Sequence, residues 1–170
     1  LLNKHGIDLW LAERVIRLAR GSLWLSVIGF YSITSLLSMF ISNTATTAMM
    51  VPIAVSLIDK KFPRMRTMLI LGTAYAANIG GNGTVVGSPP NAIAAAALNI
   101  SFFDWFKIGF PTMVLMFPLV VIALWYVIKP ESDAYVNRVD SSNFRWTPSA
   151  KGTIALFLFT VTCWILSSQI

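Results

Sequence analysis

The chain has 170 residues, of which 56% are hydrophobic and only 12% are charged. Soluble domains usually carry about 25% charged residues, so this composition indicates an integral membrane protein. The formal charge of +6 does not point to nucleic acid, because the basic residues flank apolar windows instead of forming a stripe. The single cysteine, Cys163, excludes an internal disulfide and a zinc cluster.

Four stretches contain no Asp, Glu, Lys or Arg, namely residues 21–58, 67–103, 108–128 and 152–170. A helix needs about 20 mostly apolar residues to cross the hydrocarbon core of a bilayer, and each stretch reaches about this length. We therefore expect an all-α membrane protein surrounded by the lipid bilayer.

Residues 1–20 precede the first window and are predicted to form an amphipathic interfacial helix. Ile7, Leu11, Val15 and Leu18 recur at helical spacing, while the basic residues project elsewhere. A basic amphipathic helix of this kind lies in the plane of the membrane interface. For the first few residues, the end of a preceding transmembrane helix is an equal alternative.

The window 21–58 is predicted to form a re-entrant hairpin with its tip near residues 42–44. Basic residues flank it on both sides, so the positive-inside rule places both ends in the cytoplasm. A straight helix of this length would measure about 57 Å against a hydrocarbon core of about 30 Å, so the chain has to enter and return. The polar stretch SNTATT, residues 42–47, lies beside the midpoint. Two full crossings are the alternative.

The window 67–103 is predicted to be a discontinuous transmembrane helix that is broken at residues 80–91. That segment, GGNGTVVGSPPN, holds four glycines and two prolines, which cannot continue a regular helix. Irregular backbone at membrane depth is tolerated where protein or a watery cavity satisfies its polar groups. We therefore expect the two broken points to meet in one site, as paired discontinuous helices do in transporters.

The rest of the chain continues this pattern. Residues 108–128 are predicted to form a transmembrane helix, and residues 152–170 begin another. The basic residues of segments 59–66 and 129–151 are typical of cytoplasmic loops. Because the chain starts with Leu and ends as a hydrophobic window is barely complete, we expect it to be a fragment of a longer chain.

The polar residues at the two breaks predict an anion site. Ser42 or Asn43 is a suitable N-cap for the helix after the hairpin tip. Ser88 is expected to cap the helix after the second break, with Pro89 in its first turn. Free N–H groups and the positive end of the dipole at such helix starts favour an anion.

Neutral oxygen atoms at the same place predict a site for an alkali cation such as Na⁺. The four windows contain no carboxylate, whereas hydroxyl, amide and backbone carbonyl oxygens are hard neutral ligands. Ser38 and Ser42 are expected to lie one helical turn apart on one face. Asn43 is expected to offer its amide oxygen to the cation while its NH₂ group remains free for the anion. The alternative is that such polar groups serve helix packing, the role we expect for Thr46 and Thr47.

Two segments carry a resemblance to a known family. FISNTATTAMMVPIA, at residues 40–54, and NIGGNGTVVGSPPNAIAAAAL, at residues 78–98, resemble signature segments of the divalent anion:sodium symporter family. That family comprises sodium-coupled dicarboxylate, citrate and sulfate transporters. The resemblance implies an elevator-type homodimer of two inverted repeats, each with a re-entrant hairpin and a broken transmembrane helix. This chain would be the first repeat, with residues 152–170 beginning the second.

The resemblance also implies roles for individual residues. The Na⁺ ligands that it implies are Ser38, Ser42, Asn43 and Gly87, the last through its backbone carbonyl. The substrate contacts that it implies are Ser42, Asn43 and Thr44, with Ser88 and Pro89 at the opposite wall.

The expected function is secondary active transport in a bacterial inner membrane, in which Na⁺ entry drives uptake of a di- or tricarboxylate such as succinate. Half of the substrate site would lie in this chain. The alternatives are a sodium-independent dicarboxylate exchanger, a citrate- or sulfate-selective symporter, and a structural membrane subunit that transports nothing. An enzyme is not expected, because the sequence offers no nucleophile–base pair and no buried carboxylate.

Overall fold

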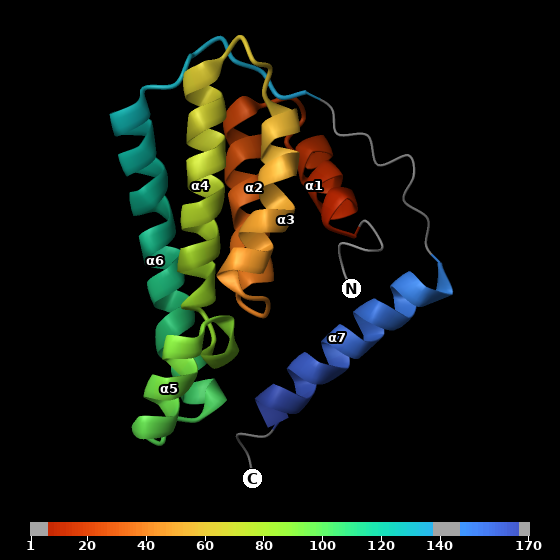
Figure 1. Cartoon of the computed structure of the whole chain (residues 1–170), viewed down its shortest axis with the longest axis vertical. Coiled ribbons are helices and arrows are strands. Elements are labelled where there is room, and N and C mark those ends of the chain that lie inside the picture. Colours follow the sequence, from red (N-terminus) through yellow and green to blue (C-terminus); the bar gives the residue numbers. More distant parts are fainter. Residues whose placement is uncertain (1–6, 138–146, 167–170) are drawn as a thin grey trace.

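The computed structural model describes residues 7–137 and 147–166, and within these ranges it is helical with no strand (Figure 1). This confirms the all-α prediction. Parts of the predicted segments 1–20, 129–151 and 152–170 lie outside the described residues. The elements are α1 (Ile7–Leu18), α2 (Leu23–Ser38), α3 (Asn43–Leu57), α4 (Pro63–Gly81), the 3₁₀ helix η2 (Val85–Gly87), α5 (Pro89–Ala97), α6 (Phe102–Ile128) and α7 (Pro148–Leu166).

Helices α2 and α3 form a hairpin whose tip is the short turn of residues 39–42 (Figure 1). Each helix starts at a serine N-cap, because the Ser22 hydroxyl accepts from Leu25 N at 3.4 Å and the Ser42 hydroxyl accepts from Ala45 N at 3.3 Å. The chain thus reverses direction inside the first apolar window. The depth of the tip in a membrane stays a prediction.

Helices α4 and α5 are separated by residues 82–88, a shorter break than the predicted 80–91. Gly80 and Gly81 remain helical because the hairpin packs directly against them. Pro89 and Pro90 open α5, where the missing N–H of proline costs no helical hydrogen bond. In Figure 1, α5 lies beyond the hairpin tip, past the ends of α2 and α3.

Helix α6 begins at Phe102, earlier than the predicted 108, because Ser101 caps it by accepting from Asp104 N at 3.1 Å. Asp104 also pairs with Lys107 at 2.9 Å on the surface, so both charges fit into the first turns of the helix. Among the described helices, α6 is the one long and apolar enough to cross a membrane by length and composition. Helix α7 begins at Pro148, inside the segment predicted as a loop.

Helix α4 lies at the centre of the bundle and contacts α2, α3 and α6 (Figure 1). Its face toward α2 carries small residues at every fourth position, Gly72, Ala76 and Gly80, which we call the small-residue stripe. The Tyr31 ring lies on Gly72, and the Ser35 hydroxyl donates to the carbonyl of Ala76 at 2.9 Å. A Cβ on Gly80 would lie 2.2 Å from the Ser35 carbonyl oxygen, so the two backbones are in contact.

The segment after α6 ties together the ends of α3 and α4. The Glu131 carboxylate accepts from the N–H groups of Arg64 at 3.1 Å and Met65 at 2.8 Å, in the first turn of α4. Asn137 N donates to the Leu57 carbonyl at 2.7 Å, at the end of α3. Partial burial raises the pKa of Glu131, but the hydrogen bonds from Met65 and Arg64 outweigh it, so the net pKa lies below the ordinary 4.5.

Replacing Glu131 by glutamine is expected to lower the melting temperature by a few degrees, because it removes the negative charge that caps α4. Since the pKa of Glu131 is lowered by folding, the stabilisation is present above pH 4.5 and is lost as the pH falls through the lower pKa of the folded state. Thermal unfolding from neutral to acidic pH checks this, with a smaller acid loss expected in the variant. Asp133→Asn is the control, because it removes a charge from the same segment without touching these two hydrogen bonds.

Candidate functional site

The hairpin tip and the break between α4 and α5 lie against each other. The Thr84 hydroxyl, in the break, donates to the carbonyl of Met39 at the tip. The Asn43 side chain, in the first turn of α3, lies on Gly81, where a Cβ would be 2.2 Å from Asn43 Oδ1. The structure therefore brings the two irregular segments together.

Asn43 connects α2 with α4 through both ends of its carboxamide. Its Oδ1 accepts from the Ser38 hydroxyl at 2.8 Å, and its Nδ2 donates to Asn78 Oδ1 at 3.2 Å. The expectation that the NH₂ group is free was therefore wrong for one of its two hydrogens. Asn78 was missed by the sequence reasoning, because a single Asn in an apolar helix does not reveal which helix it faces.

Ser38 and Ser42 do not lie one turn apart on one helical face, as the sequence suggested. Helix α2 ends at Ser38, and the four residues of the turn separate it from α3. Ser38 is fully buried and reaches Asn43, whereas Ser42 is exposed and caps α3. The Ser42 hydroxyl uses its oxygen to accept from Ala45 N, which leaves its hydrogen available to donate.

The backbone of the break is held by two buried side chains, Thr84 and Asn91. Asn91 Nδ2 donates to the carbonyls of Gly81 and Thr84, each at 2.8 Å, and the Thr84 hydroxyl accepts from Gly87 N at 3.1 Å. Gly87 packs on Gly81 so tightly that a Cβ would lie 2.3 Å from the Gly81 oxygen. The one signal for Asn91 in the sequence is its position as a polar residue at the start of AIAAAAL.

The start of α5 offers fewer donors than the sequence suggested. Ser88 occupies the N-cap position, but its side chain makes no capping hydrogen bond. Pro89 and Pro90 have no N–H, and Asn91 N already donates to the Ser88 carbonyl at 3.1 Å. The N-terminus of α5 therefore contributes its dipole rather than free N–H groups. The N-terminus of α3 is the better source of hydrogen-bond donors.

Burial differs among the residues expected to hold a cation and an anion. Ser38 and Gly87 are buried and Asn43 is half-buried, whereas Thr44 and Pro89 are exposed. Ser42, which was expected in both groups, is exposed, and Ser88 is half-buried. A small ion that sheds its water suits buried oxygens, and a larger carboxylate needs the open side.

Thr46 differs from the role expected for it. Its hydroxyl is buried and has no hydrogen-bond partner among the described residues, so it does not form the predicted helix–helix hydrogen bond. The backbone N–H of Thr46 donates to the Ser42 carbonyl at 2.9 Å, which completes the first turn of α3.

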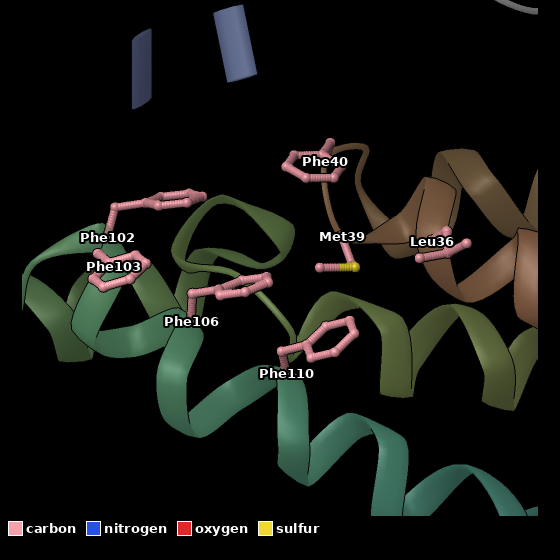
Figure 2. A pocket seen from close by; sticks show the side chains of 7 residues that line it. All are labelled: Leu36, Met39, Phe40, Phe102, Phe103, Phe106 and Phe110. Atoms are coloured by element: carbon pink, nitrogen blue, oxygen red, sulfur yellow. The ribbon is translucent and has the colours of Figure 1, made fainter. Parts of the chain in front are cut away.

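A separate cavity of about 290 Å³ lies on another side of the hairpin tip (Figure 2). Figure 2 shows Met39 reaching from the tip toward Phe106 and Phe110 of α6. Its lining is apolar throughout and consists of Leu36, Met39, Phe40, Phe102, Phe103, Phe106 and Phe110. Such a surface offers no hydrogen-bond donor to a carboxylate and no oxygen ligand to Na⁺, so we assign this cavity to the packing of the tip on α6.

An apolar helix long enough to cross a bilayer and two adjacent helix breaks lined by neutral polar groups are features that membrane transporters share. The chain belongs to the citrate transporter family, whose sequence profile matches residues 1–169.

The curated relatives are transporters as well. An uncharacterized transporter of Haemophilus influenzae is 39% identical over 99% of this chain, and the uncharacterized transporter MJ0672 of Methanocaldococcus jannaschii is 34% identical over 99%. The sodium-dependent dicarboxylate transporter SdcS of Staphylococcus saprophyticus is 33% identical over 74% of this chain. These matches confirm the resemblance to the divalent anion:sodium symporters. The chain spans 37%, 39% and 28% of the lengths of these relatives.

Proposed function

We propose that this chain is part of a secondary active transporter that couples Na⁺ entry to uptake of a dicarboxylate such as succinate. The observation that carries the proposal is the junction of Ser38, Asn43 and Gly81, where neutral oxygens from the hairpin meet the broken helix. A relative named as a sodium-dependent dicarboxylate transporter supports the same substrate class.

The residues present fit a Na⁺ ion. Ser38 Oγ and Asn43 Oδ1 lie 2.8 Å apart, and both are neutral hard oxygens. Gly81 and Gly87 let the Asn43 side chain and the backbone of the break approach closely, and we take the carbonyl of Gly87 as the third ligand, with Ser42 beside it. When Na⁺ binds, the Ser38 hydroxyl hydrogen has to turn away from Asn43, so that both oxygens face the ion.

The carboxylate is placed on the exposed side of the same junction. The start of α3 supplies partial positive charge, the Ser42 and Thr44 hydroxyls and the second hydrogen of Asn43 Nδ2 supply donors, and Ser88 with Pro89 forms the opposite wall. A cation and an anion bound at adjacent sites attract each other strongly in a medium of low dielectric constant. This attraction is a physical basis for coupling the binding of the two ions.

The membrane arrangement is part of the proposal. The α2–α3 hairpin enters and leaves the membrane from the cytoplasmic side, and segments 59–66 and 129–151 are cytoplasmic. A second inverted repeat completes the substrate site, and two copies of the full-length protein form an elevator-type homodimer in a bacterial inner membrane.

Replacement of Na⁺ by choline is expected to lower uptake of labelled succinate by the full-length protein at least about tenfold, the effect of losing about 1.4 kcal/mol of coupling. Citrate and sulfate, added as competitors, report the substrate class. Uptake that is unchanged in choline would contradict the coupling and favour a sodium-independent exchanger. No uptake of any of the three anions, with the folded protein in the membrane, would favour a structural subunit.

A further inference from the structure

We propose that Asn78 on α4 is a positioning residue that sets the orientation of the Asn43 carboxamide and, through it, the affinity for Na⁺. The inference rests on the proposed function, because it takes the amide oxygen of Asn43 as a ligand of the cation. Its basis is the hydrogen bond between helices α3 and α4, in which Asn43 Nδ2 donates to Asn78 Oδ1 at 3.2 Å.

The two ends of the Asn43 carboxamide have nearly equal shape but opposite chemistry. The oxygen end accepts hydrogen bonds and attracts a cation, whereas the NH₂ end donates and repels one. In the structure, the oxygen end faces Ser38 and the nitrogen end faces Asn78. Rotating the carboxamide by half a turn about its Cβ–Cγ bond would exchange the two ends with little steric change. The hydrogen-bond partners therefore decide which end faces the cation site.

Ser38 cannot make this choice, because a hydroxyl donates as readily as it accepts and can pair with either end. Gly81, on which the carboxamide lies, has no side chain to contribute. Asn78 differs from Ser38 in the observed geometry, because it presents its carbonyl oxygen to Asn43, and this oxygen accepts only from the NH₂ end. Asn78 is exposed, so its side chain is not needed to fill the core.

This geometry distinguishes two substitutions of similar size. Asn78→Leu keeps the shape but removes the acceptor, so the Asn43 carboxamide is no longer held with its oxygen toward Ser38. Asn78→Asp presents an oxygen in either rotamer, so the observed orientation is retained. The added negative charge would also attract a cation and weaken binding of a dicarboxylate.

The test is the Na⁺ concentration that gives half-maximal succinate uptake, measured at saturating succinate in the full-length protein. Asn78→Leu is expected to raise it about fivefold, as loss of one fixed hydrogen bond does. Asn78→Asp is expected to keep it within about twofold of wild type or to lower it, since an acceptor remains. The Na⁺-induced rise in melting temperature in detergent gives the same comparison for a variant that does not transport.

The control is Thr67→Ala on the same helix, because this hydroxyl donates only to the Pro63 carbonyl of its own helix, at 2.8 Å. The inference is overturned if the leucine variant shifts the Na⁺ requirement no more than this control, or if leucine and aspartate shift it equally. A higher KM for succinate with an unchanged Na⁺ requirement also overturns it, since Asn78 would then contact the anion directly. If uptake by the wild-type protein does not depend on Na⁺, the proposed function itself is wrong, and this inference is wrong with it.

Discussion

Replacing Asn43 by alanine is expected to lower Na⁺-dependent succinate uptake about 100-fold. The substitution removes the oxygen that meets Ser38 and the NH₂ group, whose first hydrogen meets Asn78 and whose second is the proposed anion donor, so both the proposed cation ligand and an anion donor are lost. Each hydrogen bond to a charged group contributes about 1.5–3 kcal/mol, and about 1.4 kcal/mol is a factor of ten. Uptake by the full-length protein in Na⁺ and in choline measures the effect.

The control for Asn43→Ala is Ser32→Ala, because the Ser32 hydroxyl donates to the Ile28 carbonyl of its own helix at 2.8 Å. Both variants are compared at equal amounts of folded protein in the membrane. If the Asn43→Ala protein transports at more than half the wild-type rate, Asn43 is not part of the site. A variant that loses stability without losing Na⁺ binding would assign Asn43 to packing.

Replacing Gly80 by alanine is expected to destabilise the fold by about 3 kcal/mol, because the new Cβ would meet backbone atoms of Ser35 at 2.2–2.7 Å. The neighbouring change Gly81→Ala is expected to act differently, since its Cβ would meet the Asn43 carboxamide, a side chain that can swing away. Compared with Gly80→Ala, Gly81→Ala should therefore destabilise the fold less and weaken Na⁺ binding more. Thermal unfolding in detergent, with and without Na⁺, separates the two effects.

Gly152→Ala is the matched control for both glycine variants, because nothing lies within 4 Å of a Cβ at that position of α7. It is expected to leave stability unchanged or to raise it slightly, as alanine favours a helix over glycine. A Gly80→Ala protein that unfolds at the same temperature as the Gly152→Ala protein would contradict the close contact between α2 and α4.

The parts of the fold that depend on local chemistry were predictable from the sequence. The Ser42 cap follows from a serine placed before an apolar run, and the interruption of the helix follows from glycine and proline. The edges of the break were less predictable. Gly80 and Gly81 stay helical because they pack against α2 and α3, a tertiary contact that local propensity does not contain.

The contacts of the candidate site show the same limit. Asn43 was singled out from its motif, yet its partner Asn78 lies 35 residues away and becomes a neighbour only when α3 packs on α4. The capping of α4 by Glu131 spans 66 and 67 residues and has no local signal either. Ser88 failed as a side-chain cap although its position was right, because Pro90 has no N–H and Asn91 N donates to the Ser88 carbonyl instead.

The small-residue stripe has a consequence for how the site can open. Side chains act as deformable spacers between helices, and a rotamer change can widen such a gap. Between α2 and α4 that spacer is missing at Gly80, so the separation of the helices is set by the hard radii of backbone atoms. We therefore expect the two walls that meet at Asn43 to resist being parted and, under the proposed function, to move together as one stiff body.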